Sequence, residues 1–373
     1  MNNSGYLEYE CEINYQTCPD YHIATSLLKI CPVILIVVGT FGNILSIVIL
    51  LRPTIRKSVC SVYLIALSVS DLLVLYTGLL RQWIYKTFDV DIRDIGSTAC
   101  KFHTGIVYFS LQLSSWILVA LTTERTFLVW FPRETKARYT KKVAVISLVI
   151  IAVCLLILNS HTLYGLDMQY VEIINGSTLY TCYLASLSYK AFWTSTWPWI
   201  DLSIFCVVPF CCLLIGNTLI FVKVMCSRRA ANRQVSISTI ETRHQRSKFY
   251  SLSITLMVIN STFLICNIPI CVFMIVRQTW IHNLNEEQRA EMHLVWSIVN
   301  ILMYSNNSIN FFLYILSGRR FRNELVCVLQ LIKKKALVLF TTKPKKARRT
   351  VSVKYTNNTD GLCVPHSHNE SQT

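Results

Sequence analysis

The chain has 373 residues, of which 53% are hydrophobic and only 15% are charged, and its mean hydropathy is +0.44. Soluble domains carry about 25% charged residues, so this composition argues against a soluble protein and favours a membrane protein. A net charge of +16 is also typical of nucleic-acid-binding proteins, but the placement of the charges, described below, argues against that class.

Seven stretches of the chain are long and apolar enough to cross a bilayer. A spanning segment needs about 20 mostly apolar residues, and it must be helical because lipid offers no partners to backbone amides. The predicted spans are residues 27–51, 60–80, 101–130, 143–165, 198–225, 249–276 and 294–317. The predicted fold class is therefore an all-α membrane protein, a seven-transmembrane helix bundle occupying residues 27–317.

The basic residues predict how the bundle is oriented. With the N-terminus outside, 28 of the 36 Lys and Arg residues fall on the cytosolic side, and 13 of the 20 acidic residues fall outside. This is the positive-inside pattern, and it places the C-terminus in the cytoplasm. The positive charge then faces the anionic lipid of the inner leaflet, so no nucleic-acid partner is expected.

The external part contains candidate sites of covalent modification. Residues 1–26 are polar and acidic and lack the features of a signal peptide, so we expect an extracellular N-terminal tail. N-glycosylation sequons begin at Asn2 and Asn175. Four cysteines are external, where disulfides are permitted: Cys11, Cys18, Cys100 and Cys182. A bridge from Cys100 to Cys182 would pin the loop before the fifth span, and a second, less strongly indicated bridge would join Cys11 to Cys18.

Asp71 is the clearest polar residue within a predicted span, where ionisable groups are rare and usually functional. In the seventh span, Asn306, Asn310 and Tyr314 repeat every four residues and share one helix face with Asn307. Carboxylate, hydroxyl and amide oxygens suit a small hard cation such as Na⁺. The alternative is a purely structural hydrogen-bond network, and the residues alone leave both interpretations open.

A second polar pair, Glu124 and Arg125, lies at the cytosolic end of the third span. An arginine there pairs with the neighbouring carboxylate or extends to the membrane interface. Taken alone, the pair predicts only an interfacial ion pair. Arg125 also follows Cys100 by 25 residues, a spacing that belongs to a larger pattern.

This pattern resembles the rhodopsin-like (class A) family of G protein-coupled receptors over residues 27–330. The motifs that carry the resemblance are, in chain order, Gly42-Asn43, Leu67-Ser68-Val69-Ser70-Asp71, Glu124-Arg125-Thr126, Pro209, Phe263-x-x-Cys266-Asn267-Ile268-Pro269 and Asn310-Phe311-Phe312-Leu313-Tyr314. The residues from Asn306 to Arg322 are similar to those of invertebrate neuropeptide receptors of the FMRFamide or thyrotropin-releasing-hormone-like type.

The resemblance implies a function as well as a fold. The chain is expected to be a receptor rather than an enzyme, to lie in the plasma membrane and to activate a heterotrimeric G protein. Kinases, arrestin and membrane lipid are further expected partners. The residues that carry coupling and switching are expected to be Glu124, Arg125, Asn267, Pro269 and Tyr314. No cofactor is expected apart from an allosteric Na⁺ held by Asp71, Ser114, Asn307 and Asn310.

The resemblance also divides the cytoplasmic part. It implies a disulfide between Cys100 and Cys182 and a short amphipathic eighth helix over residues 318–335. Residues 336–373, rich in Lys and Arg and then in Ser, Thr and Asn, are expected to form a disordered tail. Cys327 on the amphipathic segment is a candidate for palmitoylation.

Three departures from the family motifs bear on switching. Phe311 stands where the family has a proline in the seventh span, which removes a kink and restores an amide donor. Asn267 replaces a tryptophan in the sixth span, and Asn217 replaces a tyrosine in the fifth. These changes call the energetics of activation into question, but not the fold.

The ligand class is narrowed by what the sequence lacks. Val107 stands where receptors for monoamines carry an aspartate, and residues 291–317 lack the Schiff-base lysine of opsins, so a peptide is expected. By matching positions, the expected ligand-binding residues are Arg81, His103, Tyr108, Gln112, Asp201, Arg277, Trp296 and Asn300. Asp201 is expected to bind a cationic group of the ligand, or alternatively to pair with Arg81 or Arg277 in the empty receptor.

Two other functions were weighed. A transporter or channel is disfavoured because the sequence lacks internal repeats and paired Gly- and Pro-broken helices. A chemosensory receptor on the same fold is the nearer alternative. Expression in neurons rather than sensory epithelium would separate it from a neuropeptide receptor.

Overall fold

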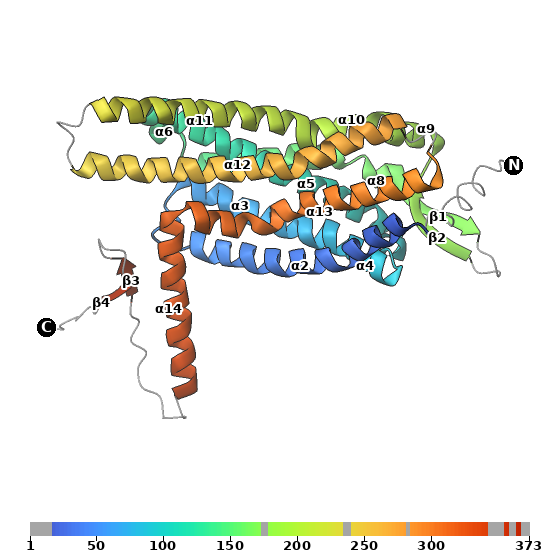
Figure 1. The fold of residues 1–373 in the computed structure, drawn as a ribbon, viewed down its shortest axis with the longest axis horizontal. Helices are drawn as coiled ribbons and strands as arrows, with labels where there is room; N and C mark the ends of the chain where they lie inside the picture. Colours follow the sequence, from blue (N-terminus) through green and yellow to red (C-terminus); the bar gives the residue numbers. More distant parts are fainter. Residues whose placement is uncertain are drawn as a thin grey trace.

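The computed structural model describes residues 17–172, 178–233, 240–280, 284–341, 354–357 and 363–366. Over these ranges the chain forms a bundle of long helices lying side by side, with one more helix running across an end of the bundle (Figure 1). Asn2, Asn175 and Cys11 lie outside the described residues, whereas Cys18 is described and is a free thiol.

The described part of the bundle consists of seven helical rods. The first four are α2 (Pro19–Leu50), α3 (Val59–Val74) continued by a π-helical turn and α4 (Leu80–Phe88), α5 (Ser97–Trp130), and α7 (Lys141–Asn159) followed by α8 (Thr162–Gly165). The last three are the broken rod of α9 (Leu187–Ala191), α10 (Trp197–Leu202) and α11 (Val208–Arg233), then α12 (Ile240–Trp280) and α13 (Glu286–Ser317). A short helix, α6 (Pro132–Arg138), connects the third and fourth rods.

Six of the rods are long and apolar enough to cross a membrane by length and composition, and α13 is not among them. The asparagines and serines in the last part of α13 lower its hydropathy. They belong to the polar network described below, and α13 still packs inside the bundle against α2 and α12. The seventh predicted span is therefore present as a helix, but it carries much of the bundle's polar content.

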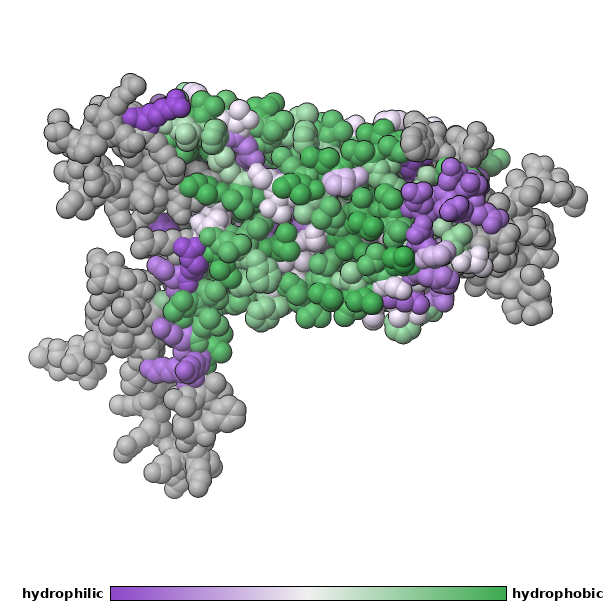
Figure 2. All heavy atoms as spheres, viewed as in Figure 1, coloured by the Kyte–Doolittle hydropathy of each residue, from purple (hydrophilic) through white to green (hydrophobic). Residues whose placement is uncertain are grey.

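The outer surface of the bundle suits a lipid environment. Figure 2 shows hydrophobic residues covering the middle of the rods and hydrophilic residues gathered toward the two ends. Large apolar side chains face outward from several helices, including Phe41 (66% exposed) on α2 and Ile157 (68% exposed) on α7. In water such a surface would be unfavourable, whereas in a bilayer it contacts lipid tails.

Glycines let the first and seventh rods approach closely. A Cβ on Gly39 would lie 3.1 Å from the Cα of Ser308, and a Cβ on Gly42 would lie 3.0 Å from the Cβ of Phe311. Small residues at helix contacts are typical of membrane bundles because packing has to replace the missing hydrophobic effect. This contact brings Asn43, next to Gly42, within reach of α13.

Several boundaries and one pair of strands differ from the sequence-based expectation. Helix α2 begins at Pro19 rather than near residue 27, because the first helical position tolerates a proline with no free N–H. Helix α14 extends over Arg319–Thr341, six residues beyond the predicted end of the eighth helix. Two short paired strands, β3 (Lys354–Asn357) and β4 (Cys363–His366), lie within residues predicted to be disordered.

The prediction of an all-α fold missed one external element. Strands β1 (Leu166–Glu172) and β2 (Thr178–Leu184) form an antiparallel hairpin between the fourth and fifth rods. Their alternating Tyr, Val, Thr and Leu residues are typical of strands. This loop lies outside the transmembrane helices, so its backbone N–H and C=O groups need partners of their own. The pairing of β1 with β2 supplies these hydrogen bonds.

Candidate functional site

A fully buried carboxylate lies on α3 in the centre of the bundle. Asp71 is 0% exposed and its oxygens accept three hydrogen bonds from two other helices. Ser114 Oγ on α5 donates at 3.0 Å and Asn307 Nδ2 on α13 at 2.8 Å to Oδ1, while Asn310 Nδ2 donates at 2.7 Å to Oδ2. Asn43 Nδ2 on α2 donates to the backbone carbonyl of Asn307 at 2.8 Å. One carboxylate thus organises contacts among four helices.

The residues around Asp71 have donor atoms that fit a small cation. The Oδ1 atom of Asn310 and the Oγ atom of Ser68 are both buried and have no hydrogen-bond partner among the described residues. With the Asp71 carboxylate and the Ser114 hydroxyl they make a set of hard oxygen donors. Among the described residues, no group of three or more His, Cys, Asp or Glu side chains is arranged to hold a metal ion. Asn306 is buried on α13 but makes none of the described bonds to Asp71.

Two of the predicted switch residues, Glu124 and Arg125, lie toward the opposite end of α5 from Cys100. Arg125 Nε lies 3.0 Å from Glu124 Oε2, and both side chains are almost fully buried. The Cys60 thiol on α3 also lies beside the Arg125 guanidinium. Tyr314 is buried with its hydroxyl unpartnered among the described residues, and its ring packs on Phe321 of α14 with centroids 5.4 Å apart. Arg125 is therefore enclosed by its own helix and α3 in this conformation.

The sixth rod carries an internal polar bridge that sequence reasoning missed. Asn260 Nδ2 on α12 donates to Thr122 Oγ1 on α5 and to Asn217 Oδ1 on α11, both at 2.8 Å. Asn217 had appeared only as a departure from the family pattern. Asn267 lies two turns further along α12, is buried, and donates to the Phe263 carbonyl at 2.8 Å. It precedes Pro269, which lies inside the continuous helix α12. An asparagine within each of two apolar spans, Asn217 and Asn260, was the available sequence signal for this bridge.

Asp201 lies toward the outer end of the bundle, in the broken fifth rod. Its Oδ1 atom accepts a hydrogen bond from Gln112 Nε2 at 2.9 Å, and Gln112 Oε1 accepts one from Asn159 Nδ2 at 2.7 Å. Tyr108 lies close by on α5 and meets Trp197 edge to face, with centroids 5.4 Å apart. Three predicted ligand-binding residues, Asp201, Gln112 and Tyr108, therefore lie together.

The alternative prediction, a pairing of Asp201 with Arg81 or Arg277, is not found among the described residues. Arg81 instead binds Asp91, through Nε at 3.0 Å and Nη2 at 2.6 Å. Arg277 is exposed on α12 and makes no ion pair with a described residue. Asp91 lies just after the end of α4, only ten residues from Arg81 in the chain. The short turn between them brings the Asp91 carboxylate onto the Arg81 guanidinium.

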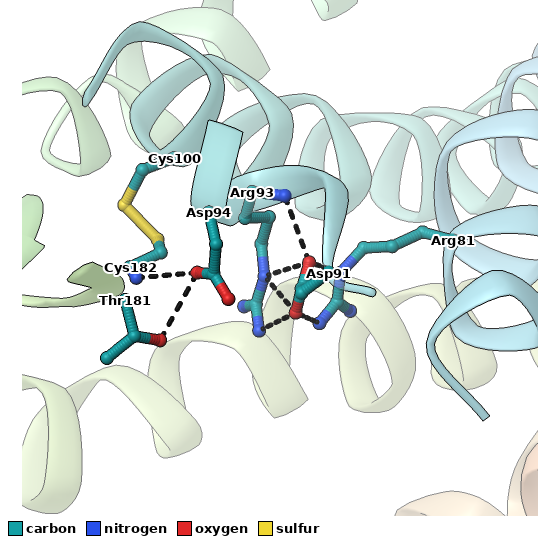
Figure 3. A network of polar contacts seen from close by, with 7 residues as sticks. All are labelled: Arg81, Asp91, Arg93, Asp94, Cys100, Thr181 and Cys182. Atoms are coloured by element: carbon teal, nitrogen blue, oxygen red, sulfur yellow. Dashed lines mark hydrogen bonds and ion pairs between the residues drawn. A yellow bond between two sulfur atoms is a disulfide. The ribbon is translucent and has the colours of Figure 1, made fainter. Parts of the chain in front are cut away.

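Arg81 belongs to a network around the external disulfide (Figure 3). Cys100 is bonded to Cys182, the pairing that the family resemblance implies. On the η2 turn (Ile92–Ile95), Asp94 Oδ1 accepts a hydrogen bond from the backbone N–H of Cys182 at 2.7 Å. Sequence reasoning missed Asp91, Arg93 and Asp94, although the alternating charges in D-I-R-D were a visible signal.

The remaining predicted pocket residues do not form one cluster. Asn300 Nδ2 on α13 donates to Gln82 Oε1 on α4 at 2.7 Å, and both residues are buried. Trp296 lies one turn away beside His293, with centroids 5.8 Å apart. Both ring nitrogens of His103 are buried and have no partner among the described residues. The candidate site thus divides into one group near α5 and α10 and another near α4 and α13.

Two further cysteine features were not predicted. Cys206, in the π-helical turn before α11, is bonded to Cys271 on α12, a pairing that the sequence analysis did not predict. Cys327 on α14 is 1% exposed and disulfide-bonded. A sulfur held in a disulfide cannot be acylated, so this structure does not support the predicted palmitoylation of Cys327.

Residues 42–314 match the sequence profile of the family described as 7 transmembrane receptor (rhodopsin family). Among similar proteins, the type-1 angiotensin II receptor of Ovis aries is 30% identical over 142 residues, 38% of this chain and 39% of that receptor, so the match spans about two fifths of its length. The cysteinyl leukotriene receptor 1 of Cavia porcellus is 24% identical over 83% of this chain and 85% of that receptor. The neuromedin-U receptor 2 of Rattus norvegicus is 26% identical over 78% and 71%, respectively.

The family match covers most of the helical bundle, including the Asp71 network, the Glu124–Arg125 pair and the external disulfide. It accounts for the apolar rods as membrane spans of a receptor rather than parts of an enzyme or transporter. The chain is therefore a multi-pass membrane protein and belongs to the rhodopsin family of seven-transmembrane receptors.

Proposed function

We propose that this receptor binds an extracellular peptide through Asp201 and signals by activating a heterotrimeric G protein at Arg125. The proposal includes a plasma-membrane location with the N-terminus outside and the C-terminus in the cytoplasm. The similar receptors are named for angiotensin II, cysteinyl leukotriene and neuromedin-U. Because these receptors are named for different ligands, the ligand class of this receptor has to be inferred from the chemistry of its site.

The observation that carries the proposal is the environment of Asp201. This half-buried carboxylate receives one described hydrogen bond, from Gln112, and no described cation pairs with it. A carboxylate that is partly removed from water is stabilised by a nearby cation. No described residue of the receptor supplies that cation to Asp201, so a cationic group of the ligand can do so. Tyr108 packs edge to face on Trp193 and on the buried Trp197 nearby. The partly exposed rings of Tyr108 and Trp193 suit contact with a cationic group. An amine or guanidinium of a peptide fits these partners.

A physical route connects this site with the cytosolic end. Gln112 and Arg125 belong to the same helix, α5, so displacement of its outer half is transmitted along a rigid element. Trp116 Nε1 on α5 donates to the Ile204 carbonyl of the fifth rod at 3.0 Å, and Thr122 meets Asn260 of α12 one to two turns further on. A ligand that binds more tightly to an arrangement in which α12 has moved away from α5 shifts the population toward it.

In this mechanism Arg125 is the group that the G protein recognises. In the described conformation it is held by Glu124 and is 5% exposed. Opening of the cytosolic end would expose the guanidinium to its partner. Kinases and arrestin are proposed as regulators of the cytoplasmic segments, as the family resemblance implies.

We also propose that Na⁺ binds at Asp71 in the inactive state. The ion would be held by the Asp71 carboxylate with oxygens of Ser114, Asn307 and Asn310. The residues supply hard donors, and an ion there would compensate a carboxylate that is otherwise stabilised only by neutral groups. No other cofactor is proposed.

The test is a second-messenger assay in cells that express the receptor and receive a neuropeptide library. Once an agonist is found, Asp201→Asn is expected to reduce its potency at least tenfold, equivalent to about 1.4 kcal/mol. Glu287→Gln, which removes an exposed carboxylate at the start of α13, serves as the matched control and should leave potency unchanged.

Two results would count against the proposal. Unchanged potency in Asp201→Asn at equal surface expression would remove Asp201 from the ligand contacts. Activation only by non-peptide odorants or tastants would favour the chemosensory alternative. The resemblance to FMRFamide or thyrotropin-releasing-hormone-like receptors predicts which part of the library to screen first.

A further inference from the structure

We infer that Arg81 and Arg93 form a subsite for a carboxylate group of the ligand, which rests on the proposed role of the outer bundle as a ligand pocket. The feature concerned is the outer clasp, defined here as Arg81, Asp91 and Arg93 (Figure 3). It lies beside the external disulfide, away from Asp201, and sequence reasoning had assigned only Arg81 to the ligand.

The geometry of the clasp places two cations on one carboxylate. Asp91 accepts from Nε and Nη2 of Arg81 and, at 3.2 Å or less, from Nε and Nη2 of Arg93. The backbone N–H of Arg93 adds a further bond at 3.0 Å. The side chain of Asp91 is 7% exposed, whereas those of Arg81 and Arg93 are 22% and 30% exposed. The carboxylate is enclosed and the two guanidiniums form its accessible side.

Asp94, the other acidic residue near the clasp, does not neutralise the second positive charge. Asp94 is directed toward β2, where its Oδ1 atom accepts from Cys182 N and from Thr181 Oγ1 at 3.2 Å (Figure 3). No ion pair joins Asp94 to either arginine of the clasp. The clasp therefore holds one more positive than negative charge.

The guanidiniums retain unused donors. Each arginine has five N–H donors, and the bonds to Asp91 use Nε and Nη2, so each Nη1 group has no acceptor among the described residues. Two nearby side chains also have polar atoms without a partner among the described residues. They are both ring nitrogens of His103, which lies within electrostatic range of both arginines, and the Nε2 atom of the buried Gln82, whose Oε1 atom accepts from Asn300. A forked arginine edge binds a carboxylate through two parallel bonds, which makes this anion the best match.

The two charged sites together restrict the ligand. His103, beside the clasp, and Gln112, beside Asp201, are nine residues apart on α5, which is about 14 Å along the helix axis. An extended peptide covers that distance in about four residues. The ligand that fits both sites carries a cationic group and a carboxylate separated by about four residues.

The direct test uses glutarate as the probe and its neutral diamide, glutaramide, as the matched compound. Thermal unfolding of the purified full-length receptor is measured in each compound at constant ionic strength. Glutarate is expected to raise the unfolding midpoint and glutaramide is not. Arg93→Gln should abolish the shift while keeping the Arg81–Asp91 pair, and Arg81→Gln provides a second variant that keeps Arg93 on Asp91. Arg289→Gln, which removes an exposed external arginine, should retain the shift.

Equal shifts with glutarate and glutaramide, or a full glutarate shift in both clasp variants, would overturn the subsite. Agonist peptides then identify the source of the carboxylate: loss of potency on C-terminal amidation indicates the terminus, and loss on Glu→Gln or Asp→Asn indicates a side chain. Agonists insensitive to both changes would also overturn it, although the receptor would still be a peptide receptor. A silent peptide library with an Arg93-dependent glutarate shift would instead refute the peptide proposal and keep the subsite.

Discussion

Two aspartates inside the bundle differ in how completely the protein surrounds them. Asp71 accepts bonds from Ser114, Asn307 and Asn310 and has no exposed surface. Asp201 is half-buried and accepts one described bond, from Gln112. The fold supplies Asp71 with three hydrogen-bond donors, which suits a structural or ion-binding role. It supplies Asp201 with one described donor, which leaves that carboxylate able to bind a ligand. The number of donors supplied by the protein separates the two roles.

The largest expected effect is on stability at Asp71. Replacing Asp71 with Ala leaves three buried donors without their acceptor, at about 1–3 kcal/mol each, so the free energy of unfolding should fall by about 3 kcal/mol or more. Asp71→Asn retains an acceptor oxygen and should lose less. Thermal unfolding of the purified receptor in detergent measures both. Equal stability of Asp71→Ala and the unmodified receptor would show that the three donors find other partners.

The second prediction concerns Asp201, where function should suffer more than stability. Asp201→Ala removes one acceptor from Gln112, and we expect a loss of about 1 kcal/mol in unfolding free energy. Agonist potency should fall at least tenfold, as measured by second-messenger output at matched surface expression. If Asp201→Ala destabilised the receptor as strongly as Asp71→Ala, the number of hydrogen-bond donors would not distinguish the roles of the two carboxylates.

The third prediction separates the aspartates by their response to sodium. If Na⁺ binds at Asp71 in the inactive state, replacing bulk Na⁺ by choline should raise agonist affinity several-fold, since an ion that binds one state shifts the equilibrium toward it. Asp71→Asn should abolish this sensitivity and Asp201→Asn should preserve it. Radioligand competition in the two salts measures the effect. Sodium sensitivity that survives in Asp71→Asn would leave Asp71 with its structural role alone.

The smallest effect is expected at a third carboxylate, Asp91, which lies outside the membrane spans. Burial alone would raise its pKa, but hydrogen bonds from Arg81 and Arg93 outweigh burial and hold the pKa well below its usual range. A lowered folded-state pKa contributes stability that is present above the ordinary value near 3.9 and is lost only as the pH falls toward the folded-state pKa.

The stability difference between Asp91→Asn and the unmodified receptor should therefore be the same at pH 5, 6.5 and 8. Thermal unfolding of both proteins across these pH values measures it. A difference that shrinks between pH 8 and pH 5 would show that the clasp does not hold Asp91 ionised. Asp91 thus serves as the reference carboxylate, neutralised by arginines rather than by neutral donors.

The Asp71 network shows how far sequence reasoning reached. The i, i+4 spacing predicted that Asn306 and Asn310 share a face of the seventh span, and Asn310 does bind Asp71. Asn306, which satisfies the same spacing, makes none of the described bonds to Asp71, while Asn307 makes one. Spacing defines a face of a helix, but the rotation of α13 against α3 decides which side chains on that face reach the carboxylate.

The ligand side shows which contacts sequence reasoning did not predict. Matching positions predicted eight ligand-binding residues but not their partners in the structure, where Asn300 binds Gln82 and Arg81 binds Asp91. The pairing of Arg81 with a near neighbour across a short turn competes with any pairing to Asp201. Asn260, assigned no role, joins α12 to α5 and α11. Whether two polar groups pair across a bundle depends on the distance between helices, which no single-chain pattern contains.

The sequence by itself determined the membrane spans, the family and the central polar residues of the bundle. Hydropathy and the order of motifs are properties of the linear chain, so they can be read without a structure. It did not determine the external hairpin, the Cys206–Cys271 bond, the division of the pocket or the outer clasp. Those features depend on which side chains meet after the rods pack. The difference between Asp71 and Asp201 is of this kind: both are single carboxylates in apolar segments, and only the packed bundle gives one of them three donors and the other one.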